Sequence, residues 1–350
     1  MVNELFIISL ITFFSVILWW GFKTLPGERW QIIASLPTIR ERHGLWRGIN
    51  LTYYGLLTAN AYVTAVAILC ILLGSMGTPL EETFAVIVAI LLICVPASKY
   101  MARIVEKKKH TFTVGGAFFV GMLVAPWMIC LVNIVLGTRM DGMLQCIPAL
   151  AAFIIAYAFG EGMGRLACIS FGCCYGKSLS NSHPFFRRIF QKYCFMFTGE
   201  TKKVAYEGGL EGVKVMPIQA VTAVLYITIG IIGVCLFTKS YYMTAFLLVI
   251  IVTQAWRSLS EMFRADFRGF GKITGYQMMA MISILYSLGL SYFWPSQSYR
   301  VPDAAVGVSA LWDPAIILFL LVLWYVIFLY TGRSAVTGST LTFYVNKDRV

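Results

Sequence analysis

Charged residues are scarce in this chain of 350 residues. Asp, Glu, Lys and Arg make up 13% of it, whereas a soluble domain carries about 25%. Hydrophobic residues make up 59%, and several windows exceed about 18 apolar residues, the length that crosses the hydrocarbon core of a bilayer. The strict alternation typical of a membrane β-barrel is also missing. The composition therefore excludes a single soluble domain and predicts an all-α, polytopic helical membrane protein.

Histidine is rare, and cysteine spacings typical of metal sites are missing. The three histidines, His43, His110 and His183, are far apart, and no C-x-x-C pair occurs among the nine cysteines. Most of the cysteines lie inside apolar runs, where cysteine behaves as a small hydrophobic residue. The sequence alone therefore predicts no metal centre, no disulfide framework and no cofactor.

The net charge of +12 suits anionic lipid headgroups, nucleic acid or the cytoplasmic membrane surface. The positive-inside bias of membrane proteins is the simplest of these explanations, and we expect no nucleic acid partner.

Nine apolar segments are long enough to cross a membrane. They lie at about 4–22, 51–74, 83–103, 114–137, 144–172, 216–238, 241–263, 274–294 and 314–332. The first segment reads as a retained helix because no small-x-small cleavage site precedes Lys23. The longest polar stretch, 177–214, predicts a small cap domain or a loop, and 333–350 reads as a polar tail.

Lysine and arginine are distributed unevenly between the two sides of the predicted bundle. One side carries 25 of the 28, in 23–47, 99–110, 165–214, 257–272 and the tail. The three on the other side are Arg139, Lys239 and Arg300. The positive-inside rule then places the basic side in the cytoplasm and the N-terminus outside.

A stretch rich in glycine and cysteine ends the fifth predicted span. Residues 164–176 read Gly-Arg-Leu-Ala-Cys-Ile-Ser-Phe-Gly-Cys-Cys-Tyr-Gly. An arginine at membrane depth is costly, so Arg165 is expected to face the protein interior and meet an anion. The stretch resembles the G-R-x-G-N-F-x-N-x-E-x-x-G motif of bacterial prolipoprotein diacylglyceryl transferases. Within that superfamily it looks like the divergent branch G-R-x-x-C-x-x-x-G-C-C-Y-G.

Further segments are similar to this family, in the same order, over about 50–290. Thr52 to Leu57 resembles its W-Y-G-L-L start, Gly115-Gly116 its H-G-G, and Pro217-Ile218-Gln219 its P-x-Q. Residues 257–266 resemble its R-x-x-x-E-x-x-R-x-x-D run, and Gln277 the glutamine of its final core helix. The resemblance implies a seven-helix transferase-like core at 49–295 with a head or cap insertion at 177–214. An extra helix and basic loop at 1–48 precede this core, and an extra helix and polar tail at 296–350 follow it.

The family moves a diacylglyceryl group from phosphatidylglycerol to a prolipoprotein cysteine and releases glycerol phosphate. The resemblance therefore implies an anionic phospholipid substrate, a lipoprotein precursor as partner, and the bacterial cytoplasmic (inner) membrane as location. Arginine suits a phosphate clamp because its planar fork binds phosphate through two hydrogen bonds and stays charged. The implied catalytic residues are Arg165, Arg257 and Glu261, the last expected to orient Arg257 one turn away. The implied substrate-binding residues are Tyr54, Gly115, Gly116, Gly164, Cys168, Cys173, Tyr175, Gly176, Gln219 and Arg264.

Three positions depart from the family pattern. Val114 stands where the family has the histidine before Gly-Gly, Cys168 replaces the motif asparagine and Cys173 the motif glutamate. The family's base is therefore missing, and His110, one turn earlier, could substitute for it. A cysteine near Arg165 could act as a nucleophile, although packing is its commoner role in helices.

Two other functions remain open from the sequence. One is a sister transferase that uses the same lipid clamp with another acceptor, such as a small or cytoplasmic nucleophile. The other is a non-enzymatic protein that binds anions or lipids, since arginines also line anion pathways. In the family the site faces away from the cytoplasm, whereas the charge distribution here favours a site that faces the cytoplasm.

Overall fold

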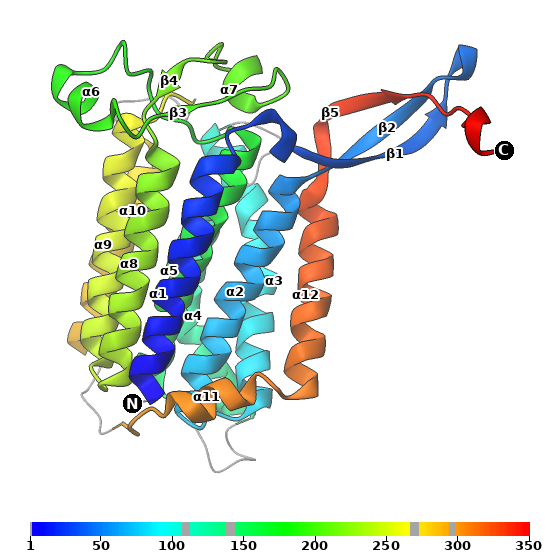
Figure 1. Cartoon of the computed structure of the whole chain (residues 1–350). Helices are drawn as coiled ribbons and strands as arrows, with labels where there is room; N and C mark the ends of the chain where they lie inside the picture. Colours follow the sequence, from blue (N-terminus) through cyan, green and yellow to red (C-terminus); the bar gives the residue numbers. More distant parts are fainter. Residues whose placement is uncertain (1, 107–112, 137–143, 267–272, 294–298) are drawn as a thin grey trace.

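The computed structural model describes residues 2–106, 113–136, 144–266, 273–293 and 299–350. The described residues hold nine long helices that run side by side in one bundle (Figure 1). They are α1 (Val2–Thr24), α2 (Tyr53–Ser75), α3 (Leu80–Glu106), α4 (Val114–Val135), α5 (Cys146–Phe171), α8 (Ile218–Thr238), α9 (Tyr242–Ser260), α10 (Gly275–Phe293) and α12 (Pro314–Gly332).

Eight of these helices, within the described residues, are long and apolar enough to cross a membrane. The ninth, α10, is less apolar, but it runs beside α9 and α4 through the same bundle. Each predicted span overlaps one of the nine helices. The prediction of an all-α polytopic membrane protein is therefore confirmed.

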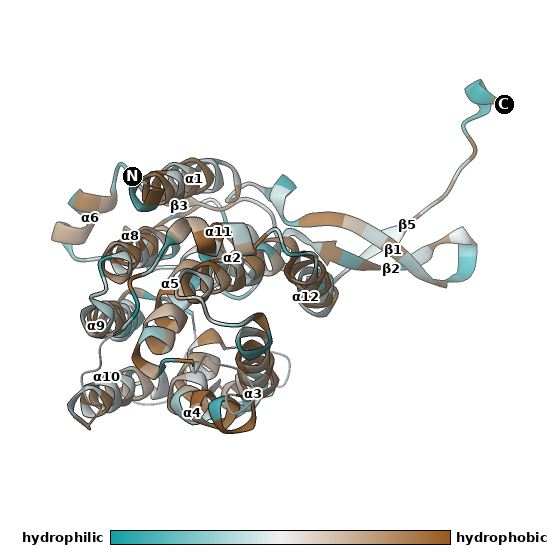
Figure 2. Ribbon diagram, turned by 90° about the horizontal axis from the view of Figure 1, so that it is seen from below, coloured by the Kyte–Doolittle hydropathy of each residue, from teal (hydrophilic) through white to brown (hydrophobic). Residues whose placement is uncertain are grey.

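Helix α5 forms the centre of the bundle, with α2, α8 and α9 packed against it (Figure 2). Its apolar window is 83% buried, whereas those of α1 and α12 are 17% buried and present most of their surface outward. The sequence of α5 is rich in alanine and glycine, and such small residues let neighbouring helices approach closely within a membrane. Residues on α5 are therefore the best placed to contact several helices at once.

Local signals set where α12 and α2 begin. Asp313 caps α12 by accepting a hydrogen bond from the Ala315 backbone N–H at 2.8 Å, and Pro314 fills the first helical position. Thr52 caps α2 through the Gly55 backbone N–H.

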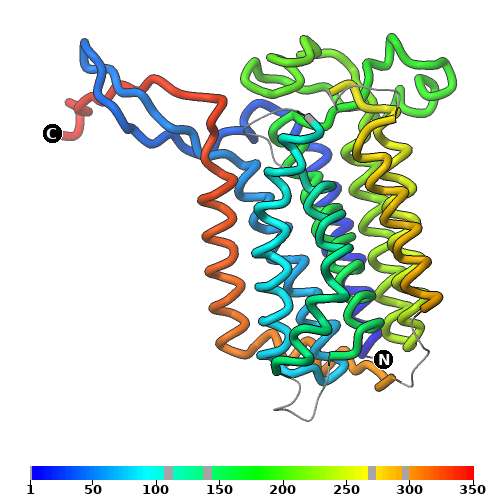
Figure 3. Tube along the Cα trace, turned by 180° about the vertical axis from the view of Figure 1, so that it is seen from behind, coloured from blue at the N-terminus to red at the C-terminus, as the bar shows by residue number. Residues whose placement is uncertain are grey.

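A small antiparallel sheet projects from the bundle as an arm (Figures 1 and 3). Its strands are β1 (Ile32–Arg40), β2 (Trp46–Thr52) and β5 (Arg333–Leu341), in the order β1-β2-β5. The sequence predicted a basic loop and a polar tail for these segments, so the sheet is a correction. The sequence of β5 is rich in Ser and Thr and shows only a weak alternation of polar and apolar residues. It forms a strand because β2, far away in the sequence, pairs with it and places Trp46 opposite Leu341.

The segment 177–214 forms a small head on one end of the bundle (Figure 1). It contains α6 (Pro184–Phe190), α7 (Lys203–Tyr206) and the paired strands β3 (Phe195–Met196) and β4 (Lys214–Val215). Just before α7, the buried ammonium of Lys202 donates hydrogen bonds to the backbone oxygens of Leu25, at 3.1 Å, and Ser170. Burial lowers the pKa of Lys202 to about 8. This lysine ties the head to the ends of α1 and α5.

The head and the arm lie at the same end of the bundle, and α11 (Ala304–Ala310) lies at the other (Figure 1). The remaining short elements are 3-10 helices at Glu28–Trp30, Arg42–Gly44, Glu261–Phe263 and Lys347–Arg349. Of the described lysines and arginines, Lys239 and Arg300 belong to the α11 end. Arg139, also predicted for that end, lies outside the described residues. The structure thus groups the other described lysines and arginines at the head end.

Candidate functional site

A cavity of about 530 Å³ runs from the head into the bundle. Its head end is lined by Arg165, Arg257 and Arg264. The apolar part of its wall, from α2, α3, α4 and α5, includes Leu69, Ile87, Leu91, Met122, Leu150 and Phe153. A smaller adjoining pocket is lined by the same three arginines together with Gln219 and Glu261. The cavity therefore joins a cationic end to an apolar wall.

One carboxylate lies between two of the arginines. Glu161, one turn before Arg165 on α5, forms an ion pair with it. The same Oε1 atom lies 3.8 Å from Nη1 of Arg257, and all three side chains are nearly buried. Sequence reasoning missed Glu161, although a glutamate inside an apolar helix is itself a signal of a functional interior. It holds the two guanidinium groups close together despite their mutual repulsion.

Arg257 lies against the start of α4 and against an aromatic ring. A Cβ atom on Gly115 would overlap the Arg257 guanidinium, so only glycine leaves room for it. On the other side, Cζ of Arg257 lies 5.6 Å from the ring centre of Tyr276, within cation–π range. Gly116 has a different structural role, because a Cβ atom there would overlap the Met101 side chain of α3. Gly115 thus positions the arginine, and Gly116 lets two helices pack.

Arg264 is held by two carboxylates. Asp266 accepts hydrogen bonds from its Nε and Nη2 atoms, both at 2.9 Å, and Glu261 Oε1 lies 3.7 Å from its Nη1. Glu261 was expected to orient Arg257, and the structure also places it in an ion pair with Arg264. Burial raises the pKa of Asp266 to about 6, even beside this arginine. The Asp266 carboxylate therefore changes charge near neutral pH.

The segment after the motif cysteines anchors Arg264 through the backbone. Gly176 and Arg264 form an antiparallel β-bridge, and the backbone N–H of Ala265 donates a hydrogen bond to the carbonyl oxygen of Tyr175 at 3.1 Å. A Cβ atom on Gly176 would overlap the Met216 carbonyl oxygen, so the chain passes too closely there for any other residue. The Tyr175 side chain is buried and packs against Gly208 in the head. Both predicted residues therefore support the site without lining it.

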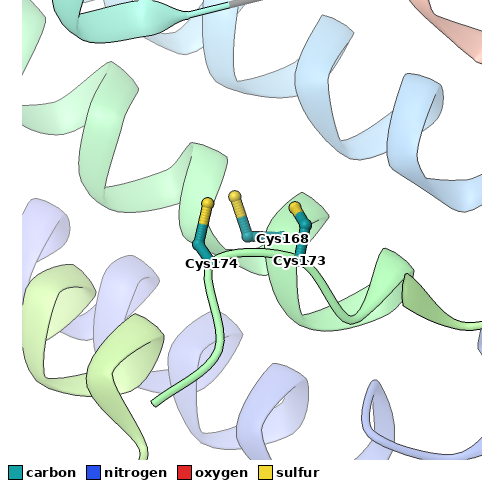
Figure 4. Close-up of side chains that lie close together, drawn as sticks. All are labelled: Cys168, Cys173 and Cys174. Atoms are coloured by element: carbon teal, nitrogen blue, oxygen red, sulfur yellow. The ribbon is translucent and has the colours of Figure 1, made fainter. Parts of the chain in front are cut away.

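Three cysteines meet beside the arginines (Figure 4). Cys168 lies on the last turns of α5, Cys173 and Cys174 follow it, and all three line the cavity as thiols. Hydrogen bonds with Cys168 and Cys173 lower the pKa of the Cys174 thiol well below its usual value, with help from Arg264 and Arg165.

Gln219, at the start of α8, supports the turn that carries these cysteines. Its Nε2 atom donates to the Cys173 carbonyl oxygen at 2.9 Å. Its buried Oε1 atom accepts no hydrogen bond within the described part of the chain. Gln219 lines the smaller pocket, so this acceptor is available to a donor on a bound ligand.

The predicted site residues separate into lining and supporting groups. The large cavity is lined by Arg165, Arg257, Arg264, Tyr54, Gly164, Cys168 and Cys173, and the smaller pocket also by Gln219 and Glu261. Gly115, Gly116, Tyr175 and Gly176 lie behind these surfaces. Residues of the cavity that the sequence interpretation did not single out include Glu161, Lys203, Tyr206 and Thr331.

The three departures from the family pattern all face the cavity. Val114 lines it and is 46% exposed, and Cys168 and Cys173 line it as well. No histidine occurs among the described lining residues, and His110 lies outside the described part of the chain. Glu161 is a poor base because two guanidinium groups stabilise its charged form. The described cavity therefore presents three arginines but lacks the family's proton acceptor among its described lining residues.

The apolar helices define a multi-pass membrane protein, and its cavity joins three arginines to an apolar wall. The family model for prolipoprotein diacylglyceryl transferase matches residues 44–293, which is 250 of the 350 residues. This chain belongs to that family, as its motifs predicted, and is a membrane transferase. The match runs from the arm to α10 and leaves all of α1 and all of α12 outside it. A search of curated proteins found no match.

Proposed function

We propose that this protein transfers the diacylglyceryl group of a phosphatidylglycerol-type phospholipid to a thiol acceptor. The observation that carries the proposal is the cavity that joins Arg165, Arg257 and Arg264 to an apolar wall. The arginines bind the phosphate diester, and the apolar wall receives the acyl chains. Both halves of an anionic phospholipid are then accommodated in one continuous space.

The reaction needs stabilisation of the departing glycerol phosphate. When the glyceryl C–O bond breaks, negative charge grows on the phosphate oxygen that keeps the electron pair. Guanidinium groups that are already positioned by Glu161 and Gly115 stabilise this charge without having to reorganise. Because the three arginine side chains are nearly buried, this attraction is stronger than it would be in solution.

The acceptor reaches the cavity from the head end. At this end, the rim of the cavity includes Lys203 of the head and Arg333, Ser334 and Val336 of β5. By family likeness one candidate acceptor is a prolipoprotein cysteine. A second candidate is a thiol on the cytoplasmic side, favoured by the concentration of basic loops at this end. The membrane is proposed to be a bacterial cytoplasmic membrane.

Reconstitution tests the proposal directly. Purified protein in phosphatidylglycerol vesicles is incubated with a short peptide that carries a single cysteine, and the products are analysed by mass spectrometry. The expected result is a diacylglyceryl thioether on the peptide and free glycerol phosphate, with no product from phosphatidylethanolamine vesicles. Binding of phosphatidylglycerol without any product would instead show a lipid-binding protein, and the proposal would be wrong.

Transfer activity is expected to fall as the pH drops through about 6. Burial favours the neutral acid and raises the pKa of Asp266 to about 6, from a usual 3.8, so the carboxylate is charged above this pH and takes up a proton below it. Protonation removes the charge-assisted pair that orients Arg264. Initial rates of thioether formation across this range measure the effect.

Asp266→Asn is the control for this pH dependence. The variant has a lower rate at neutral pH, but its rate should no longer change with an apparent pKa near 6. The same acid limb in the variant and the wild type would contradict the assignment to Asp266.

The head end is expected to face the cytoplasm. Ser180 in the head and Ser309 in α11 are both exposed and lie at opposite ends of the bundle. Each is changed to cysteine, one at a time, in a cysteine-free background. An impermeant thiol reagent should label Ser309→Cys in intact cells and Ser180→Cys only after lysis. The reverse pattern would place the site outside and restore exported prolipoproteins as the acceptors.

A further inference from the structure

The sulfur atoms of Cys168, Cys173 and Cys174 lie within 4.8 Å of one another. Figure 4 shows the three side chains pointing to the same side from the end of α5 and the turn after it. In the described part of the chain, no other group of three or more His, Cys, Asp and Glu side chains is arranged so closely. The cluster lines the same cavity as the arginine clamp.

The backbone, rather than flexible side chains, brings these thiols together. Gly172 has a φ of 72°, in the left-handed region, and the Cys173 N–H returns to the Cys168 oxygen at 3.0 Å. This is the hydrogen bond of a Schellman turn, which reverses the chain onto the last helical turn. Cys174 then has a φ of 57°, a conformation that costs energy for a residue with a side chain. The cluster is therefore held in place at some cost to local stability.

Three thiolates form a donor set for a soft cation. Zinc and monovalent copper favour such ligands, and zinc sites with three protein ligands leave a fourth position open. Zn–S bonds of about 2.3 Å place sulfur atoms about 3.8 Å apart in a tetrahedral site. The observed 4.8 Å limit requires a movement of at most about 1 Å to reach that geometry.

The charge around the cluster suits such a complex. Three thiolates and a divalent ion carry one net negative charge. Cys174 lines the smaller pocket together with Arg165 and Arg264, and Lys203 lines the larger cavity. These positive groups stabilise the excess negative charge in surroundings of low dielectric constant.

We propose that Cys168, Cys173 and Cys174 bind one Zn²⁺ ion whose open fourth position takes the acceptor thiol. The inference rests on the proposed transfer function and explains how that function proceeds with valine at position 114. A thiol that coordinates zinc loses its proton, which passes to water. Its sulfur attacks the glyceryl carbon, an S–C bond forms, and the C–O bond to phosphate breaks. The electron pair leaves with glycerol phosphate, and no oxidant or reductant is needed.

The metal content of purified protein tests the site itself. Full-length protein purified under reducing conditions should contain about one zinc per chain by mass spectrometry, as a single three-thiolate site requires. The bound zinc should be lost in each of the single variants Cys168→Ser, Cys173→Ser and Cys174→Ser. Cys235→Ser, which changes a cysteine near the far end of α8, should keep it. Copper in place of zinc, a disulfide within the cluster, or zinc that survives all three substitutions would overturn the proposal.

Cobalt substitution tests the open position without relying on turnover. The cobalt-loaded protein should show strong thiolate-to-cobalt absorption, and the single-cysteine peptide should shift it, whereas a serine analogue should not. Arg165→Lys should give the same shift, because the lipid clamp is separate from the metal ligands. A spectrum that the peptide leaves unchanged would overturn the role proposed for the fourth position.

Transfer assays separate this inference from the proposed function. Removing zinc with a chelator should lower the rate of thioether formation at least about tenfold, and added zinc should restore it. Full activity without metal would overturn the zinc proposal and leave the transferase function standing. Bound zinc and a peptide-dependent cobalt shift, with no transfer from phosphatidylglycerol, would support the zinc site and overturn the transferase function.

Discussion

Arg165→Lys is expected to lower the rate of diacylglyceryl transfer by about a hundredfold or more, the loss typical of removing one preorganised donor to a developing anion. Lysine keeps the positive charge that Glu161 requires, so the bundle should still fold. It loses the planar fork that binds two phosphate oxygens at once. Thioether formation with purified variant in phosphatidylglycerol vesicles measures the effect.

Arg187→Lys is the matched control for this experiment. Arg187 is an exposed arginine on α6 of the head, and the same substitution there should leave the rate unchanged. An equal thermal unfolding midpoint for both variants would show that any difference arises in the site. Wild-type turnover by Arg165→Lys would remove this residue from the mechanism.

Gly115→Ala is expected to reduce transfer by a similar factor, although it adds only a methyl group. Glycine-to-alanine changes inside helices usually stabilise them by roughly 0.5–1 kcal/mol. Here the new Cβ atom would overlap the Arg257 guanidinium, so the arginine must leave its place between Gly115 and Tyr276. A displacement of about 1 Å in a catalytic group can cost a hundredfold in rate. The initial rate and the affinity for phosphatidylglycerol measure the effect.

Gly289→Ala provides the comparison for this glycine. Gly289 lies in α10, where an added Cβ atom would meet no other atom within 4 Å. It should leave the rate of transfer unchanged. If Gly115→Ala were equally active, the role of Gly115 in holding Arg257 would have to be abandoned.

The membrane bundle could be predicted from the sequence because long apolar segments carry their own signal. The arm could not, since β5 is a weak strand until β2 pairs with it. Within the site, the arginines were identified through their motifs, but their partners were not all found. Glu161 contacts Arg165 locally, whereas its proximity to Arg257 depends on how α5 and α9 pack. The role of Gly115 likewise follows from α4 lying beside the end of α9.

The cysteine cluster shows why spacing alone is an incomplete guide to which cysteines lie together. Cys168 and Cys173 are five residues apart, and Cys173 and Cys174 are adjacent, so no familiar metal-binding spacing is present. The left-handed turn at Gly172 folds the chain back and makes these residues neighbours. A glycine inside the motif could have suggested the turn, but the direction of each thiol depends on the whole end of α5.

The pairing of β5 with β2 also orders events during synthesis of the protein. Thr52 at the end of β2 donates a hydrogen bond to Gly332 just before β5, and 280 residues separate the two. At a synthesis rate of about 5–20 residues per second, roughly 14–56 seconds pass between the synthesis of β2 and that of its partner β5. During that interval an edge of the arm is unpaired, and the cavity lacks the part of its rim formed by β5. In a nascent chain the cavity is therefore incomplete until β5 has been synthesised and has paired with β2.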